Sequence, residues 1–140
     1  MKLIDPFTFE IDILVQASDV DELGHVNNVV YLDWVQRVAA AHWNQVAPIQ
    51  MQNDCIWVVV RHEIDYYKSA MPGDKIKAHT WIESYHAAST VRAVKIFLEE
   101  TNEVLIQSKT TWCLLDPQNM RPKRISTEIK AALPLKPSHA

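Results

Sequence analysis

The chain has 140 residues, of which 48% are hydrophobic and 22% charged, and its formal net charge is −3. This size fits one soluble domain with a single core, so we predict one domain over residues 1–140, and the negative charge argues against nucleic-acid binding. No window approaches the roughly 20 apolar residues of a membrane span, and the N-terminus lacks the apolar core of a secretory signal, so we expect a cytoplasmic protein without a membrane partner. Cys55 and Cys113 stand alone in apolar surroundings, which predicts free buried thiols and suits a reducing compartment.

The first predicted strand covers residues 7–15, because every odd position there is apolar and the polar residues Thr8, Glu10 and Asp12 stand between them. A polar loop then leads into a long helix over about residues 28–46. In this helix apolar residues recur at spacings of three and four, and Pro48 ends the pattern. A loop rich in glutamine and asparagine is expected after it.

Four more strands are predicted downstream, separated by turn residues, at about residues 55–66, 75–85, 88–99 and 104–115. One face of the first of these strands is expected to carry Ile56, Val58, Val60, His62, Ile64 and Tyr66. Ser126 should cap a short helix that reaches about Leu133, and residues 134–140 are expected to form a frayed tail.

One strand, a long helix and four further strands predict an α+β fold. An antiparallel sheet must bury one face, and the helix at 28–46 is the only segment long enough to cover it. Its apolar stripe, led by Leu32, Val35 and Val38, is therefore expected to lie across the concave face of a five-stranded sheet. The sheet edges invite pairing with a second copy of the chain.

The most informative stretch runs from Ser18 to Trp34 and reads S-D-V-D-E-L-G-H-V-N-N-V-V-Y-L-D-W. Asp21 precedes Gly24, which tolerates a left-handed backbone, and Asn27 and Asn28 stand where the helix needs a cap. A carboxylate at a helix N-terminus can act as base or nucleophile, while the free N–H groups of the helix face a developing oxyanion. The alternative is that Asp21 and Gly24 only make a turn.

The string D-x-x-G-H-V-N-N-x-x-Y at residues 21–31 resembles the hotdog-fold thioesterases, the group around 4-hydroxybenzoyl-CoA thioesterase and its acyl-CoA and acyl-carrier-protein relatives. The fragments at residues 61–66, 72–74 and 112–116 are also similar to that group. The resemblance implies a hotdog fold, in which a five-stranded antiparallel sheet wraps around one long central helix. It further implies that Asp21 is the catalytic carboxylate and that the backbone N–H of Asn28 polarises the thioester carbonyl.

The remaining residues of the predicted site have weaker assignments. His25 is expected to orient substrate or water, or to donate to the leaving thiolate, although it can equally hold the loop's own backbone. Gly24, Asn27 and Tyr31 are expected to line the substrate site, with Asn27 also a cap or loop brace. On the strand at 55–66, Arg61 and His62 are expected to line the substrate channel or to pair across a dimer.

Five tryptophans are many large rings for one small core: Trp34, Trp43, Trp57, Trp81 and Trp112. Some are expected to lie at interfaces or to line an acyl pocket, where aromatic rings are common, and the alternative is plain core packing.

Together these features predict an acyl-CoA thioesterase that hydrolyses a fatty or aromatic acyl-CoA, acts as a homodimer or homotetramer, and needs no cofactor. No histidine or cysteine spacing suggests a metal site. Two alternatives stay open: hydrolysis of acyl-carrier-protein thioesters, and a non-catalytic protein of the same fold that only binds acyl-CoA.

Overall fold

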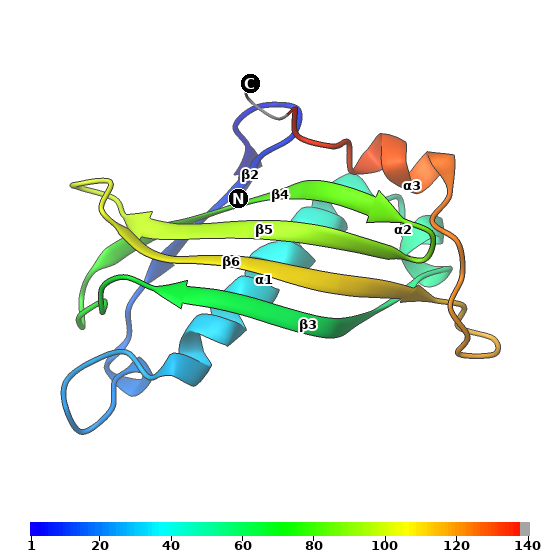
Figure 1. Ribbon diagram of the computed structural model, residues 1–140. Helices are drawn as coiled ribbons and strands as arrows, with labels where there is room; N and C mark the ends of the chain where they lie inside the picture. Colours follow the sequence, from blue (N-terminus) through cyan, green and yellow to red (C-terminus); the bar gives the residue numbers. More distant parts are fainter. Residues whose placement is uncertain (138–140) are drawn as a thin grey trace.

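The computed structural model describes residues 1–137, so the end of the predicted tail lies outside the described residues. Figure 1 shows a curved sheet wrapped around one long helix. The long helix is α1 (Asn28–Val46), and the shorter ones are the 3-10 turn η1 (Ala17–Asp19), α2 (Ile49–Asn53) and α3 (Thr127–Ala132). The strands are β1 (Lys2–Leu3), β2 (Phe9–Leu14), β3 (Ile56–Tyr66), β4 (Lys75–His86), β5 (Ser89–Leu98) and β6 (Val104–Leu115).

The strands form one antiparallel sheet in the order β1-β2-β4-β5-β6-β3. The predicted α+β class, with an antiparallel sheet packed on a central helix, is confirmed. The five long strands are those expected from the sequence, and the two-residue β1 adds a sixth. A segment this short carries no periodic pattern, and it turns back toward β2 because the Asp5 side chain accepts hydrogen bonds from the Phe7 and Thr8 amides.

Helix α1 begins and ends where its pattern predicts, and one stripe of its surface forms the centre of the core. That stripe is Tyr31, Trp34, Val35, Val38, Ala39 and His42, each buried. Leu32, which the sequence placed in the stripe, is only half-buried. Residues 49–53 were expected to be loop and instead form the short helix α2. Ser126 caps α3 as predicted, because its hydroxyl accepts from the Ile129 amide at 3.2 Å.

Strand β3 contains a β-bulge that the alternating pattern did not predict. Its register against β6 shifts between Val59 and Arg61, so Val60 has no cross-strand partner. The bulge reverses the side-chain alternation, because cross-strand partners share a face of the sheet. Trp57 and Val59 therefore share the helix-facing side with His62, and the prediction that Ile56, Val58 and Val60 share it was wrong.

Strand β3 is also the edge of the sheet, since it pairs only with β6. Val59 and Val60 are 36% and 65% exposed along this edge. An edge with unpaired backbone groups and exposed apolar side chains is suited to pairing with another chain.

Candidate active site

The loop before α1 is closed by its own backbone. The Asp21 amide donates to the His25 carbonyl at 2.8 Å, the Gly24 amide donates back to the Asp21 carbonyl at 3.0 Å, and Val20 pairs with Val26 in an antiparallel bridge. Gly24 has φ of 78°, a left-handed conformation that a residue with a Cβ rarely adopts. Gly24 therefore shapes the loop, as its position in the motif suggests.

The Asp21 carboxylate is exposed, and its two oxygens have different surroundings. Oδ1 accepts from the Leu23 amide at 2.9 Å and from the His25 amide at 3.3 Å. Within residues 1–137, Oδ2 has no hydrogen-bond partner. One oxygen thus holds the side chain in place while the other faces outward, which is compatible with both the turn role and the catalytic role considered from the sequence.

Asn27 is the N-cap of α1. Its side-chain oxygen accepts from the Val29 amide at 3.1 Å, and its own amide donates to the Asp19 carbonyl at 2.9 Å. Asn28 is the first helical residue and is exposed, and within the described part of the chain its amide donates to no acceptor. A free amide at the positive end of a 19-residue helix is a ready donor for an oxygen that gains charge.

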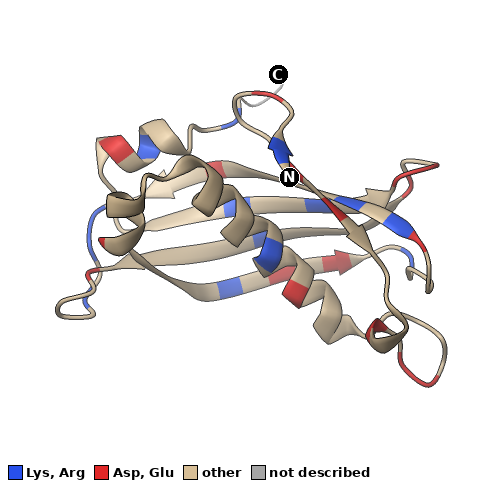
Figure 2. Cartoon of the chain, turned by 180° about the vertical axis from the view of Figure 1, so that it is seen from behind, with Lys and Arg blue, Asp and Glu red and all other residues tan. Residues whose placement is uncertain are grey.

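His25 contributes its main chain to the loop and leaves its ring in solvent. Its amide and carbonyl both bond Asp21, as described above, and the imidazole has no hydrogen-bond partner among residues 1–137. The loop is therefore braced by the backbone of His25, and the ring is free to contact a bound molecule. In Figure 2 the loop before α1 carries the colour of acidic residues and not that of Lys and Arg. By sequence its acidic residues are Asp19, Asp21 and Glu22.

Tyr31 lies in the core rather than at an open surface. It is 2% exposed, its ring packs edge-on against Trp34 and Tyr66, and its hydroxyl accepts from the Ala70 amide at 2.9 Å. Burial raises the pKa of this phenol. Because the hydroxyl already bonds the main chain, any contact of Tyr31 with substrate would have to use its ring.

Arg61 and His62 lie in the middle of β3. The Arg61 guanidinium pairs with Glu63 at 2.6 Å on the exposed face, and His62 Nδ1 bonds the Thr110 hydroxyl at 2.8 Å on the helix-facing side. Burial lowers the pKa of His62. Tyr66 marks the end of β3 near the start of α1, and Arg61 is five residues, about 16 Å, away along the strand. Within one protomer, the structure therefore does not bring Arg61 and His62 to the Asp21 loop.

A buried polar cluster under the C-terminal half of α1 was not predicted. The Arg92 side chain, on β5, donates through Nη1 to His42 Nδ1 at 2.9 Å and to the Thr80 hydroxyl at 3.1 Å. Burial and the nearby guanidinium lower the pKa of His42 to about 3, and burial lowers the pKa of Arg92 to about 10. The one sequence signal was Arg92 itself, a charged residue within an apolar strand.

Within residues 1–137, no three side chains of His, Cys, Asp or Glu gather as a metal-ligand set. The helices of the described chain include none with the length and apolar character of a membrane span. Both cysteines are free and half-buried, and burial raises the pKa of the Cys55 thiol.

Comparison with solved structures places this fold among known thioesterases. The chain superposes on a 1,4-dihydroxy-2-naphthoyl-CoA thioesterase from Synechocystis with a TM-score of 0.77 at 18% identity, covering 89% of this chain and 94% of that one. A thioesterase from Thermus thermophilus, complexed with coenzyme A and zinc, gives 0.79 at 21% identity, with 91% of each chain covered. A 12:0-ACP thioesterase from Umbellularia californica gives 0.77 at 17% identity, covering 89% of this chain and 49% of that one. The predicted hotdog fold is confirmed.

The fold is that of the hotdog group described above. More particularly, residues 5–133 match the model of the acyl-ACP thioesterase N-terminal domain, and the chain belongs to that family. It is also 25% identical over 83 residues to the chloroplastic acyl-(acyl-carrier-protein) hydrolase FATB3 of Cuphea viscosissima. That match covers 59% of this chain and only 20% of the curated relative.

Proposed function

We propose that this protein hydrolyses acyl thioesters at the N-terminal end of α1. The observation that carries the proposal is that an exposed carboxylate with one free oxygen lies in the short loop that leads into a helix whose first amide has no acceptor among the described residues. These are the Asp21 side chain and the Asn28 main chain. Membership in a thioesterase family supports the same reading.

In the proposed reaction, the thioester carbonyl accepts from the Asn28 amide, so that the positive end of α1 stabilises the oxygen as the tetrahedral intermediate forms. Asp21 acts through its free oxygen in one of two ways. As a general base it takes a proton from the attacking water, and as a nucleophile it attacks the carbonyl carbon and forms an anhydride that water then opens. In both routes the C–S bond breaks, the thiolate leaves and takes up a proton, and a free acid is released. The His25 ring stands in the same loop as a candidate donor to that thiolate.

The proposed carrier is coenzyme A, and the named alternative is acyl carrier protein. Structural relatives include proteins described as acting on each of these carriers. The match to the acyl-ACP thioesterase family favours acyl carrier protein as the carrier. The Synechocystis and Thermus proteins favour coenzyme A, because this single domain covers nearly the whole of each of those chains. Residues 19–22 include no lysine, arginine or histidine, so recognition of phosphates on either carrier would rest on other segments.

We further propose a homodimer formed through the β3 edge, or a tetramer built from such dimers. The exposed Val59 and Val60 support this choice, and a partner is the simplest way to bring Arg61 and His62 near a catalytic loop. Light scattering should give at least twice the chain mass of 16.1 kDa. A monomer at micromolar protein would contradict it. The free thiols of Cys55 and Cys113 support a reducing compartment such as the cytoplasm.

The test is thiol release from matched thioesters of both carriers. The protein is assayed with hexanoyl-, dodecanoyl- and benzoyl-CoA and with dodecanoyl-acyl carrier protein, before and after treatment with a chelator. Asp21→Asn is the test variant. Glu22→Gln is its matched control, because Glu22 is an exposed acid in the same loop without a hydrogen bond among the described residues. Activity should survive chelation and Glu22→Gln and should fall in Asp21→Asn.

Three results would change the proposal. Preference for the dodecanoyl carrier protein over dodecanoyl-CoA would move the substrate to the alternative class. Tight acyl-CoA binding without turnover would identify a non-catalytic binding protein. Activity that is lost on chelation and restored by zinc would overturn the metal-free mechanism.

A further inference from the structure

A second site lies between the C-terminal half of α1 and the sheet. It is a cavity of about 210 Å³ whose walls come from α1, β3, β5, β6 and the residue that follows α3. Trp43, Trp57 and Trp112 supply most of its apolar wall, and Leu133 closes one end. Ala40 and Asn44 are exposed, so the cavity opens to solvent beside α1.

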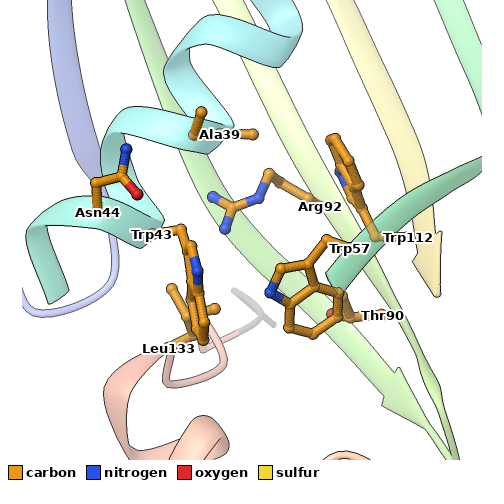
Figure 3. A pocket seen from close by; sticks show the side chains of 9 residues that line it. Ala39, Trp43, Asn44, Trp57, Thr90, Arg92, Trp112 and Leu133 are labelled. Carbon is orange, nitrogen blue, oxygen red and sulfur yellow. The ribbon is translucent and has the colours of Figure 1, made fainter. Parts of the chain in front are cut away.

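The Arg92 guanidinium projects into this cavity, between the side chains of α1 and the indole rings, as Figure 3 shows. Arg92 is only 5% exposed. Both of its hydrogen bonds use Nη1, and both partners, His42 and Thr80, are neutral. Among residues 1–137, no carboxylate forms an ion pair with it.

The cavity therefore offers a buried cationic donor, and its side-chain acceptors are uncharged: the Asn44 amide oxygen at its exposed edge and the Thr90 hydroxyl. A second unpaired donor is Trp112 Nε1, which is buried and has no hydrogen-bond partner among the described residues. The Thr90 hydroxyl, which also lines the cavity, already donates to the Ser84 carbonyl. A buried positive charge with no counterion is costly unless a ligand neutralises it. Arginine donors in a largely apolar pocket favour a planar anion that they can meet with paired hydrogen bonds.

We propose that this cavity binds a small free carboxylic acid, with its carboxylate on Arg92 and Trp112 Nε1 and an aromatic or short alkyl body among the three indoles. The volume suits a small ligand, because pockets for drug-sized molecules usually begin at about 300 Å³. The site goes beyond the proposed hydrolysis and does not rest on it.

The position of the cavity separates it from the Asp21 loop of the same chain. Ala39, in the cavity wall, is eleven residues after Asn28, which is about 16 Å along the helix axis. A benzoyl or hexanoyl group bound at the Asn28 amide is too short to reach Arg92 across that distance. A small acid in the cavity is therefore a separate molecule from a small acyl group at the loop.

Tryptophan fluorescence tests the proposal directly, since three of the five tryptophans line the cavity. The intact protein is titrated with benzoate, phenylacetate and hexanoate, and in parallel with the corresponding neutral amides. At least one acid should bind saturably and at least about tenfold more tightly than its amide, because the charged hydrogen bond is lost in the amide. No thioester is needed, so a protein that lacks hydrolase activity would still give this result.

Arg92→Met removes the charge and keeps an apolar side chain of similar length, and it should abolish the preference for acid over amide. Arg124→Met is the matched control, because Arg124 is exposed and lies outside the cavity. If Arg92→Met does not fold, Trp112→Phe removes the second donor, keeps a ring, and should still weaken acid binding. Equal affinity for acid and amide, an unchanged preference in Arg92→Met or Trp112→Phe, or no saturable binding of any acid at millimolar concentration would each overturn the proposal.

Discussion

At the start of α1 the Asp21 carboxylate stands in solvent and is held by two backbone amides. About four turns further along the helix, by contrast, the Arg92 guanidinium beside His42 is buried and held by two neutral side chains. Water and the Leu23 and His25 amides stabilise the charge on Asp21. Arg92 has no such solvent shell, and its charge is stabilised fully only when an anion binds beside it. In our proposals the first region reacts with a ligand and the second retains one.

The largest expected effect concerns Asp21. In Asp21→Asn the amide oxygen can still accept from the Leu23 and His25 amides, so stability should change by no more than about 1 kcal/mol. Turnover of a preferred acyl thioester should fall by about 10²-fold or more, because the amide neither takes a proton from water nor attacks the carbonyl readily. Steady-state thiol release and thermal unfolding measure the two quantities.

Asp21→Ala sharpens this test, because it removes both the reactive oxygen and the acceptor that holds the loop. It should lose the same turnover as Asp21→Asn and also melt at a lower temperature. If Asp21→Asn retains near-parental turnover while only Asp21→Ala is impaired, Asp21 is a turn residue, and the search for the catalytic group moves to His25.

The buried region should make stability depend on pH. His42 is 2% exposed, and its folded-state pKa is lowered from 6.5 to about 3. Between these values the unfolded chain binds a proton that the folded chain does not, so stability is complete above pH 6.5 and falls as the pH is lowered. The loss from this group should reach about 2 kcal/mol between pH 7 and pH 5. Urea unfolding at the two pH values measures it.

Two histidine variants compare the two regions in the same experiment. His42→Asn keeps an acceptor near the position of Nδ1 and does not titrate, so it should reduce the dependence on pH even if it is less stable at every pH. His25→Gln, in the exposed loop, is the control for the loss of one histidine. An equal pH dependence in the parent and in His42→Asn would show that other groups cause it.

The sequence predicted the conformation of the loop before α1 well because its determinants are local. Gly24 for a left-handed turn, Asn27 for a cap and the start of α1 at Asn28 all lie within five residues and interact mainly with one another. The five long strands were predicted for a similar reason, since each carries its own alternation. The roles of Asp21 and Asn28 in catalysis came from family resemblance, and they stay predictions.

The buried region could not be predicted in this way, because its residues come from distant segments. Arg92 meets His42 fifty positions earlier in the chain, and only the sheet register and the helix position bring them together. The β-bulge at Val60 is equally non-local: without it, Trp57 would face away from α1. Three of the tryptophans line a cavity. The sequence interpretation that some of them line an acyl pocket stays a prediction, and the polar end of this cavity was not foreseen.

A hydrogen bond between Tyr31 and Ala70 connects the loop region to the core. The Ala70 amide donates to the Tyr31 hydroxyl, and the Ala70 carbonyl accepts from the Val26 amide of the loop. Tyr31→Phe leaves a buried amide without its acceptor, which should lower the free energy of unfolding by about 1 to 3 kcal/mol. Denaturant unfolding measures the loss, with Tyr67→Phe as the exposed control. Equal stability of the two variants would show that Ala70 finds another acceptor.

The smallest expected effect is at the cap of α1. Asn27→Ala removes the acceptor for the Val29 amide and should cost about 1 kcal/mol, the usual scale of an N-cap. Asn27→Asp keeps the acceptor and places a negative charge at the positive end of the helix, so it should be at least as stable as the parent. That same charge lies beside the Asn28 amide, where the mechanism requires an oxygen to gain negative charge. Asn27→Asp should therefore lower turnover while raising or preserving stability, whereas Asn27→Ala should lower stability more than turnover. If Asn27→Asp is both as stable and as active as the parent, the oxyanion does not form at the N-terminal end of α1.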